Sequence, residues 1–265
     1  MIVSVDGLAI EGSETSRSYL EALGKGSVEP VTAALFRRAV EPGMVVVDVG
    51  AFLGQYSLLA ARQVGDAGKV FAFEPDPRNF TFLARNVERN GLADRISAVP
   101  KAISDRTGEM TLYLDPDVGS GSSIVFRRRR GVATATVSTL TLDEFLGHNI
   151  TPDVIKLDIE GGEVRALDGM AETLQRAKPD LAMFVECFPK ALRSAGAGVH
   201  GLIQRLERFG FRVYVIDEGR RRLLPITVGR SSLWSFYLYL GLHSLLVANF
   251  MCVRRKDHPL LATVR

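Results

Sequence analysis

The sequence predicts an α/β fold organised around a buried, largely parallel β-sheet. Val45–Val49 is apolar apart from Asp48, which suits a strand buried on both faces of such a sheet. Gly50 follows where this strand must turn, and Gly54 opens a helical segment four residues later. The next apolar run, residues 69–74, ends in an acid and is predicted to be a second strand. Strand, glycine turn, helix and strand in this order predict a βαβ unit.

Length and composition favour one main domain. The chain has 265 residues, of which 46% are hydrophobic, so it can build a sizeable core. We expect this domain at residues 41–256, with a hairpin insertion near residues 105–140. Residues 1–40 are predicted to be an N-terminal extension packed on the core, and residues 257–265 a C-terminal tail. The formal net charge of +3 is mild, so no nucleic-acid partner is expected.

The cysteines and the N-terminal residues bear on localisation. Cys187 and Cys252 provide neither a disulfide framework nor metal-finger spacing, which favours a reducing compartment. Residues 1–26 lack the basic start and the apolar core of a signal peptide. We therefore expect a cytoplasmic protein.

The helices are predicted from the spacing of apolar residues and from stop signals. The N-terminal extension is expected to contain a short hairpin strand within residues 1–12 and a short helix at 18–23. Residues 29–40 have helical spacing and end before a Pro-Gly turn. Residues 77–91 begin with proline, carry one apolar face and end at glycine. Residues 199–209 form a further amphipathic helix, which stops at the glycine that follows.

The other strands of the sheet are predicted from apolar runs that end at turns or at acids. These runs are residues 96–103, 153–158, 181–186, 211–216 and 248–253. Between the first two of them, residues 109–114 and 134–140 alternate in polarity and are predicted to pair as an inserted hairpin.

The segment 233–253 is ambiguous, because its length and apolar character would allow it to cross a bilayer. His243 is its only ionisable side chain, but several serines and Asn249 interrupt it, and Gly241 can break a helix. We favour a core helix followed by the last strand. Peripheral contact with a membrane surface remains the alternative.

A nucleoside site is predicted from the ends of the first two strands. Glu74 stands at the tip of the second strand, where an acid can accept hydrogen bonds from the two hydroxyls of a ribose. The turn after the first strand is Gly-x-x-x-Gly and not the Gly-x-Gly-x-x-Gly cradle for a diphosphate, because residue 52 is Phe. S-adenosylmethionine is therefore a better candidate than NAD. An ordinary glycine turn in a βα unit would explain the glycines alone equally well.

Four acids end or follow two neighbouring strands of the predicted sheet: Asp158, Glu160, Glu163 and Glu186. Carboxylates at adjacent strand ends can raise one another's pKa and so provide a general base. They can also bind Mg²⁺, which prefers oxygen ligands, and Asp158 and Glu186 are then its candidate ligands. Glu163 is explained slightly better as a cap at a helix N-terminus. We predict Asp158, Glu186 and Glu160 as catalytic residues.

Lys156 alternates with Asp158 along the fourth strand, so both side chains lie on the same face. A lysine inside a parallel sheet needs a carboxylate partner, for which Glu74, Asp158 and Glu186 are candidates.

Other ionisable residues are weaker candidates. His148 and His200 stand in predicted loop or helix-start positions, and either is a less favoured base. The arginine run 127–130 is best explained as a solvated loop, with an anionic substrate or a phospholipid surface as the alternative. Arginines 220–222 are predicted at a hairpin tip and allow the same two explanations.

A set of motifs in a fixed order resembles the FkbM family of S-adenosylmethionine-dependent methyltransferases. The matching segments are residues 41–51, 54–57, 68–77, 86–91, 102–105, 139–143 and 155–161, together with Glu163. They cover roughly residues 28–186, with weaker similarity through residue 216 and at 249–253. The resemblance implies a class I, Rossmann-like sheet of seven strands with helices on both faces and the last strand antiparallel. It also implies methyl transfer to a hydroxyl of a sugar, glycan, polyketide or glycolipid.

The resemblance also implies roles for individual residues. Gly50, Ala51 and Gly54 would line the methionine end of the cofactor, Glu74 would hold the ribose, and the turn at 101–104 would border the adenine. The full predicted set of cofactor-binding residues is Asp48, Gly50, Ala51, Gly54, Gln55, Tyr56, Glu74, Pro75, Lys101, Ala102 and Asp158. The family commonly has Asn where this sequence has Phe52, which removes one side-chain hydrogen bond.

Two other functions are weighed against methyl transfer. An NAD-linked oxidoreductase would share the ribose-binding acid, but the third glycine and a Tyr-x-x-x-Lys pair are missing. A non-catalytic nucleoside-binding protein of the same fold is the second, less favoured alternative, which Phe52 leaves open. The insertion at 115–133, the N-terminal segment and residues 233–246 are predicted to shape the acceptor pocket. The sequence indicates no oligomeric state.

Overall fold

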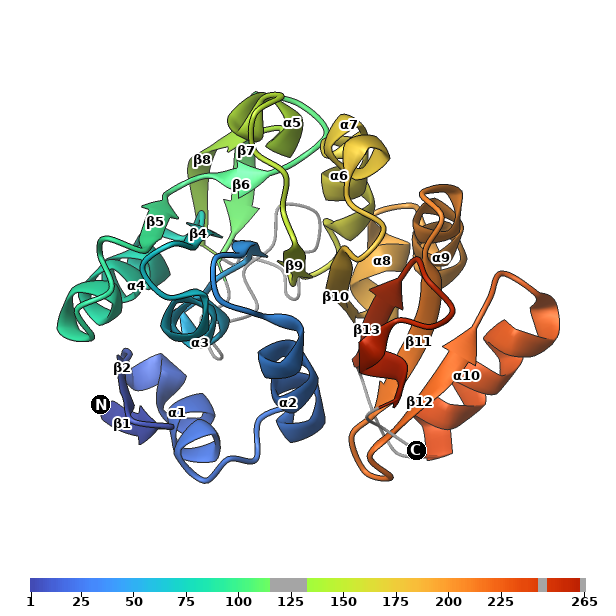
Figure 1. The fold of residues 1–265 in the computed structure, drawn as a ribbon, viewed down its shortest axis with the longest axis horizontal. Helices are drawn as coiled ribbons and strands as arrows, with labels where there is room; N and C mark the ends of the chain where they lie inside the picture. The colour runs from blue at the N-terminus through green and yellow to red at the C-terminus, as the bar shows by residue number, and fades with distance from the viewer. Residues whose placement is uncertain (115–132, 243–246, 263–265) are drawn as a thin grey trace.

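The computed structural model describes residues 1–114, 133–242 and 247–262, and an eight-stranded sheet lies at its centre (Figure 1). Its strands are β3 (Val45–Val49), β4 (Lys69–Phe73), β5 (Ile96–Val99), β9 (Val154–Leu157), β10 (Ala182–Cys187), β11 (Arg212–Asp217), β12 (Arg222–Ile226) and β13 (Ala248–Val253). Their order is β12-β11-β13-β10-β9-β3-β4-β5. The strands β5, β4, β3, β9 and β10 run parallel, and β13 is antiparallel to both of its neighbours. The mostly parallel α/β fold with an antiparallel last strand is thus confirmed.

The strand β3 lies where the chain reverses its direction of travel across the sheet. It pairs with β4 on one side and with β9 on the other, although β9 comes much later in the chain. Open α/β sheets bind ligands beside such a point, in the crevice at the carboxyl ends of the strands. The predicted site residues follow these strand ends.

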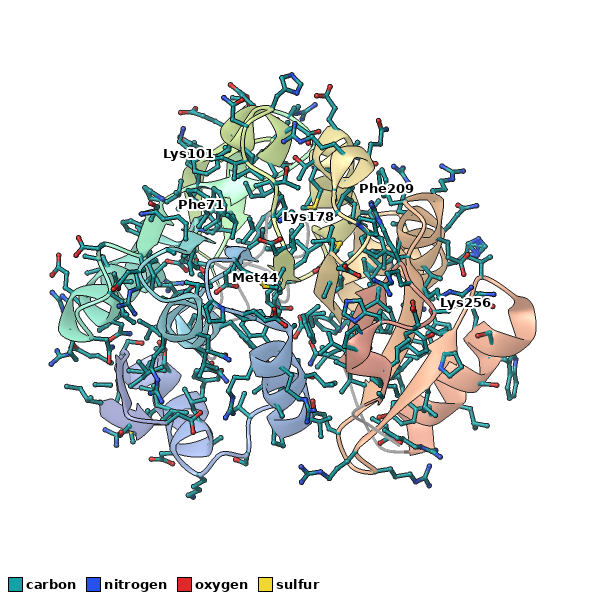
Figure 2. All side chains as sticks on the ribbon, in the orientation of Figure 1. Met44, Phe71, Lys101, Lys178, Phe209 and Lys256 are labelled. Atoms are coloured by element: carbon teal, nitrogen blue, oxygen red, sulfur yellow. The ribbon has the colours of Figure 1, made fainter. Side chains whose placement is uncertain are left out.

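Helices cover both faces of the sheet, as the alternation of side chains along a buried strand requires. Val46 belongs to one hydrophobic core and its neighbour Val47 to the other. The first core includes α2 (Pro30–Ala39), α3 (Gln55–Val64) and α4 (Pro77–Arg89). The second includes α5 (Leu142–Leu146), α6 (Glu163–Asp168), α7 (Ala171–Arg176), α8 (Pro189–Ser194) and α9 (Gly198–Arg208). Charged side chains such as Lys101 and Lys256 lie at the outside of the molecule (Figure 2).

The eighth strand, β12, extends the sheet beyond the seven strands implied by the resemblance. It forms an antiparallel hairpin with β11, and the tip of this hairpin holds the arginines at 220 and 221. Pro225 lies within β12 and cannot donate to a ladder, so a run containing it gives a poor strand signal. The edge position of β12 tolerates the proline.

The N-terminal residues pack against α4 through a buried asparagine. The hairpin of β1 (Ile2–Val5) and β2 (Leu8–Glu11) precedes α1 (Arg17–Gly24). The Asn86 side chain accepts from the Glu11 amide at 2.8 Å and donates to the Glu11 carbonyl at 2.9 Å. One fully buried side chain thereby joins the hairpin to the helix.

The predicted third strand, 96–103, is wrong as one continuous element. It divides into β5 and β6 (Ala102–Ile103), because Pro100 has no amide to donate and the chain turns there. The short β6 joins β7 (Gly108–Tyr113) and β8 (Thr134–Leu140) in a separate three-stranded sheet. The predicted pairing of the inserted hairpin is confirmed. The arginine run 127–130 lies outside the described residues.

The ambiguous C-terminal segment forms α10 (Arg230–Leu242), followed by β13. Phe236 and Leu240 are buried in the second core, and β13 is buried throughout, so the predicted helix and last strand are both confirmed. Within the described part of the chain, no helix combines the length and the apolarity that a bilayer crossing needs. Cys187 and Cys252 are both buried and unbridged.

Candidate active site

A cavity of about 250 Å³ opens at the carboxyl ends of β3, β4, β9 and β10. The predicted site residues that line it are Asp48, Gly50, Ala51, Gln55, Tyr56, Glu74, Pro75, Lys101, Ala102, Asp158, Glu160 and Glu186. Cofactor and catalytic candidates therefore share one continuous space. Gly54 is the predicted residue that the structure does not bring to this cavity.

The first glycine of the turn is required by a close approach of two strands. Gly50 has φ +87°, a region that residues other than glycine rarely adopt. A Cβ atom at this position would lie 1.8 Å from the carbonyl oxygen of Asp158, at the end of β9. The amides of Gly50 and Ala51 both donate to the Phe73 carbonyl at 2.9 Å. Gly50 thus holds three strand ends together at the wall of the cavity.

Gly54 is required by the packing of α3 against α4. It has φ +95°, and a Cβ atom there would lie 2.8 Å from a methyl carbon of Leu83 in α4. Gly54 therefore allows α3 to start against α4.

Glu74 faces the glycine turn, as a ribose-binding acid should. One of its oxygens accepts a hydrogen bond from the Phe52 amide at 2.8 Å, and the other accepts from the Asp76 amide at 2.9 Å. Burial raises the pKa of the Glu74 carboxyl to about 7, even though these hydrogen bonds lower it. The Asn79 side chain also hydrogen-bonds this carboxylate. Because each carboxylate oxygen can accept more than one hydrogen bond, these three bonds leave acceptor capacity for a ligand hydroxyl.

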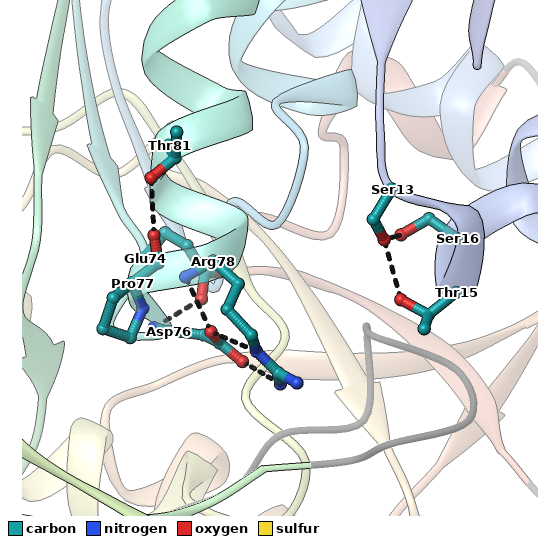
Figure 3. Close-up of polar contacts among 8 residues, drawn as sticks. All are labelled: Ser13, Thr15, Ser16, Glu74, Asp76, Pro77, Arg78 and Thr81. Atoms are coloured by element: carbon teal, nitrogen blue, oxygen red, sulfur yellow. Dashed lines mark hydrogen bonds and ion pairs between the residues drawn. The ribbon is translucent and has the colours of Figure 1, made fainter.

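The chain beyond Glu74 is held by a cap at the start of α4 (Figure 3). Asp76 accepts from the Arg78 amide at 2.9 Å, and the Arg78 guanidinium binds both Asp76 oxygens, at 3.0 and 2.6 Å. The Thr81 hydroxyl donates to the Pro77 carbonyl at 2.8 Å. The Asp76 amide that holds Glu74 is therefore fixed by the helix it begins.

Phe52 lines the cavity, and its backbone amide still binds the Glu74 carboxylate. Its φ of +52° is a left-handed conformation that asparagine adopts more readily than phenylalanine. Its ring packs edge-on against Tyr19, with the centroids 5.1 Å apart. The contact to Glu74 comes from the backbone of Phe52, so the departure from Asn leaves that hydrogen bond intact.

Asp48 lies beneath the cavity and is 1% exposed. One of its oxygens accepts from the Ser57 hydroxyl at 2.5 Å. Burial raises the pKa of the Asp48 carboxyl to about 6, and the Ser57 hydrogen bond opposes this rise.

Lys156 finds its carboxylate in Asp158, one of the three predicted candidates. The Lys156 ammonium is fully buried, lies 2.7 Å from an Asp158 oxygen and stands 5.0 Å from the centre of the Tyr56 ring. Burial alone would lower the pKa of Lys156, but the charges of Asp158, Glu29 and Glu186 outweigh it and raise that pKa. Asp158 is thus a paired carboxylate.

Glu186 differs from Asp158 in having an oxygen with no partner among the described residues. Its side chain lines the cavity and is 8% exposed, and its Oε2 atom makes no hydrogen bond. Burial, and then the charges of Asp158 and Glu160, raise the pKa of the Glu186 carboxyl well above its usual value. Such a group accepts a proton readily.

The N-terminal segment was predicted to shape a pocket, but its individual residues were not singled out. The residues that it supplies to the cavity are Tyr19, Val28 and Glu29. Glu29 has φ +43°, and its carboxylate accepts from the Tyr56 hydroxyl at 2.9 Å. The Tyr19 hydroxyl donates to Gln55 at 2.6 Å. Glu29 stands directly before the proline that begins α2, and this position was the one sequence feature that could have drawn attention to it. No feature of the local sequence distinguishes Tyr19.

Several other candidates lie away from the cavity. Glu163 accepts from the Gly161 amide at 3.0 Å at the start of α6, which fits the capping interpretation. His148 and His200 are exposed and do not line the cavity. The described residues include no group of three or more His, Cys, Asp or Glu side chains placed to hold a metal ion.

The strand order, the antiparallel β13 and the cavity at the carboxyl ends define the class I, Rossmann-like methyltransferase architecture. The family model described as Methyltransferase FkbM domain matches residues 48–213, more than half of the chain. The chain therefore belongs to the FkbM family of methyltransferases, which use S-adenosylmethionine.

Relatives and a solved structure agree with this assignment. The chain is 27% identical over 177 residues to the hexuronic acid methyltransferase AglP of Haloferax volcanii, a match covering 66% of this chain and 70% of AglP. It is 40% identical over 89 residues to the 31-O-demethyl-FK506 methyltransferase FkbM of Streptomyces tacrolimicus, covering 32% of this chain and 33% of that protein. A Clostridium thermocellum protein described as an rRNA methylase has the same fold, with a TM-score of 0.52, 9% identity and coverage of 84% and 95%.

Proposed function

We propose that this methyltransferase acts on a hydroxyl group of a sugar or a similar polyhydroxylated acceptor. The observation that carries the proposal is one continuous cavity, in which Gly50 and Glu74 line the same space as the carboxylates of Asp158 and Glu186. The names of the two relatives, a hexuronic acid methyltransferase and a 31-O-demethyl-FK506 methyltransferase, support an oxygen-bearing acceptor.

The residues at one end of the cavity fit S-adenosylmethionine. Glu74 would accept from the ribose hydroxyls, the backbone at Gly50 and Ala51 would border the methionine part, and Lys101 and Ala102 would border the adenine. The cofactor supplies a methyl group on a positively charged sulfur, and an acidic cavity favours that charge. These assignments are the ones that the family resemblance implies, and all of these residues line the cavity.

The reaction would need a group that takes a proton. The acceptor oxygen forms a bond to the methyl carbon while the bond from that carbon to sulfur breaks, and the hydroxyl proton passes to a carboxylate. We assign this role to Glu186, because Asp158 is already paired with Lys156. Asp158 and Glu160 would then orient the acceptor. A positioned base contributes typically about 10²–10⁴-fold to such a rate.

A Mg²⁺ ion held by Asp158 and Glu186 is a second way to activate the hydroxyl. The Lys156 ammonium, 2.7 Å from Asp158, favours the base, because a cation already neutralises that carboxylate. Activity that survives EDTA supports the base, whereas loss in EDTA with recovery on adding Mg²⁺ supports the metal.

Peripheral contact with an anionic membrane surface is a further proposal, which rests on α10. Trp234, Tyr237 and Leu238 are 73%, 45% and 50% exposed, which is unusual for large apolar side chains on one helix. Trp234 is the only tryptophan of the chain, so its fluorescence reports insertion directly. A blue shift and co-flotation with phosphatidylserine vesicles support the contact, and an unchanged spectrum with no flotation contradicts it.

Calorimetry with three ligands tests the proposed function. We expect S-adenosylmethionine and S-adenosylhomocysteine to bind one to one, and NAD not to bind. Failure of both sulfur compounds to bind contradicts methyl transfer. Binding without turnover of any hydroxyl acceptor would favour the non-catalytic alternative.

A further inference from the structure

The N-terminal segment reaches the cavity through Glu29, the N-cap residue of α2. A polar side chain at this position usually accepts a hydrogen bond from an amide of the helix that it precedes. The Glu29 side chain makes no such bond. Its Oε2 atom accepts instead from the Tyr56 hydroxyl at 2.9 Å, so the carboxylate serves the wall of the cavity and not its own helix.

Glu218, in the turn after β11, caps α2 in place of Glu29. Its carboxylate accepts from the Val31 amide at 2.7 Å and from the Thr32 amide and hydroxyl at 2.9 and 2.6 Å. A negative charge is also favourable at the N-terminus of a helix. Because α2 lies between α3 and β11 (Figure 1), this cap fixes the start of α2, and with it Glu29, against the sheet.

Contacts place Glu29 at the end of the cavity where the glycine turn lies. Tyr56, which binds Glu29, stands in the first turn of α3, directly after that turn. The Tyr56 ring lies 5.0 Å from the Lys156 ammonium, which pairs with Asp158 at 2.7 Å. Asp158 in turn approaches Gly50 so closely that a Cβ there would lie 1.8 Å from its carbonyl oxygen. Glu29 is therefore joined to the residues that would border the methionine part of the cofactor.

Glu29 keeps one carboxylate oxygen for a ligand. Its Oε2 atom binds Tyr56, whereas its Oε1 atom has no hydrogen-bond partner among the described residues. Unlike the Oε2 atom of Glu186, this oxygen is not enclosed by protein, and the Glu29 side chain is partly exposed within the cavity lining. The methionine part carries an ammonium group, and a carboxylate matches both its charge and its three donors.

Gln55 offers a partner for the carboxylate of the same methionine part. It lines the cavity and is 6% exposed, and its side-chain oxygen accepts from the Tyr19 hydroxyl at 2.6 Å. The NH2 group of Gln55, which has no acceptor among the described residues, therefore remains to donate to an anionic oxygen. Two residues of the N-terminal segment thus contact the first two residues of α3.

We propose that Glu29 binds the ammonium group of the methionine part of S-adenosylmethionine, and that Glu218 is the positioning residue that holds Glu29 there. The inference rests on the proposed function and adds a cofactor contact from outside the shared motifs. Glu29 and Glu218 both lie outside residues 48–213, the segment that matches the family model.

Two ligands that differ only in the ammonium group test the role of Glu29 by calorimetry on the full chain. They are S-adenosylhomocysteine and its deaminated analogue, which keeps the carboxylate. We expect the wild type to bind S-adenosylhomocysteine at least tenfold more tightly than the analogue. E29Q, which still offers Tyr56 an acceptor but lacks the charge, should raise the Kd for S-adenosylhomocysteine at least tenfold and change that for the analogue less than twofold.

The matched control is E21Q, at an exposed acid of α1 outside the cavity, which should change neither Kd. Unchanged binding of the analogue to E29Q also shows that the variant is folded. Equal affinity of the wild type for both ligands, or an equal loss of affinity for both in E29Q, overturns the assigned contact. The first of these results needs no variant.

Glu218 acts through Glu29, and a double-mutant cycle tests this. We expect E218A to raise the Kd for S-adenosylhomocysteine at least threefold and to leave the analogue within twofold. The double variant E29Q/E218A should bind S-adenosylhomocysteine as E29Q does, within twofold. Additive losses, or lower thermal stability with both Kd values unchanged, would make Glu218 an ordinary helix cap and overturn its positioning role.

The outcomes also separate this inference from the proposed function. A wild type that binds S-adenosylhomocysteine while E29Q binds it equally well overturns the Glu29 contact alone. A wild type that does not bind S-adenosylhomocysteine overturns the proposed function and this inference with it.

Discussion

The backbone amide of Phe52 donates a hydrogen bond to the Glu74 carboxylate at 2.8 Å. This bond fixes the tip of β4 against the turn that follows β3, and the two strands are neighbours in the sheet. A nucleoside that reaches from the glycine turn to the acid would therefore find both already in position. The side chain of residue 52 takes no part in this bond, so the geometry does not depend on the asparagine common in the family.

Replacing Glu74 by glutamine should weaken cofactor binding. The substitution keeps the shape but removes the charge and one acceptor, and hydrogen bonds to a charged group contribute about 1.5–3 kcal/mol. We expect E74Q to raise the Kd for S-adenosylhomocysteine by about 10- to 100-fold in calorimetry. E88Q, at an exposed position of α4, is the matched control. If E74Q and the wild type bind S-adenosylhomocysteine with equal affinity, Glu74 does not contribute to cofactor binding.

Cofactor affinity should also depend on pH. The pKa of Glu74 is about 7, so the carboxyl is largely protonated at pH 6 and largely ionised at pH 8. Because ribose hydroxyls donate to the ionised form, S-adenosylhomocysteine should bind about tenfold more tightly at pH 8 than at pH 6. E74Q should lose this dependence, and an identical pH dependence in wild type and variant would assign it to another group.

Two glycine-to-alanine substitutions should separate a close contact from backbone strain. Gly43 and Gly50 have similar φ values, +81° and +87°, but only a Cβ at Gly50 would meet another atom, at 1.8 Å. G43A should lower the free energy of unfolding by about 1–2 kcal/mol, because alanine is strained in a left-handed conformation. G50A should lower the free energy of unfolding by more than about 3 kcal/mol in urea denaturation, because Asp158 must move as well. Similar losses would contradict the close approach of β3 and β9.

Phe52→Asn restores the residue common in the family. Asparagine accepts φ +52° with less strain, whereas the edge-on contact to Tyr19 is lost. These two effects, each about 1 kcal/mol, oppose one another, so stability should change little. Because the backbone amide still donates to Glu74, the Kd for S-adenosylhomocysteine should remain within about threefold by calorimetry. A gain of tenfold or more would mean that Phe52 obstructs the cofactor.

Glu163 should make the folded state less stable as pH rises. Its pKa is raised by burial from 4.5 to about 7, so the folded protein binds the proton more tightly than the unfolded chain. Its contribution, about 3 kcal/mol at most, is present below pH 4.5 and is lost as pH passes 7. In urea denaturation, E163Q should lose less stability than wild type between pH 5 and pH 8. The exposed E172Q is the control and should follow the wild type.

Most of the sheet and of the site was predictable from the sequence. Buried parallel strands form strongly apolar runs, and in this chain several of these runs end at or near an acid. Asp48, Glu74, Asp158 and Glu186 all stand at or near such strand ends, and all four line the cavity. The Lys156 partner followed from alternation along one strand.

What the sequence did not predict depends on contacts between distant segments. Glu29 reaches Tyr56 because α2 starts beside α3, and no local pattern reports that. Gly54 has the spacing of a ligand-binding glycine, yet its open side faces Leu83. Pro100 divides the predicted strand 96–103 into two strands, and Pro225 made the edge strand β12 hard to recognise. In both cases the reason is that proline has no amide to donate to a neighbouring strand.

A crystal structure of the protein with S-adenosylhomocysteine would decide where the adenosine lies. We expect both ribose hydroxyls within about 2.5–3.0 Å of the Glu74 carboxylate oxygens, with the sulfur directed toward Asp158 and Glu186. A ribose bound elsewhere, with Glu74 contacting only protein groups such as the amides of Phe52 and Asp76, would contradict the proposed site.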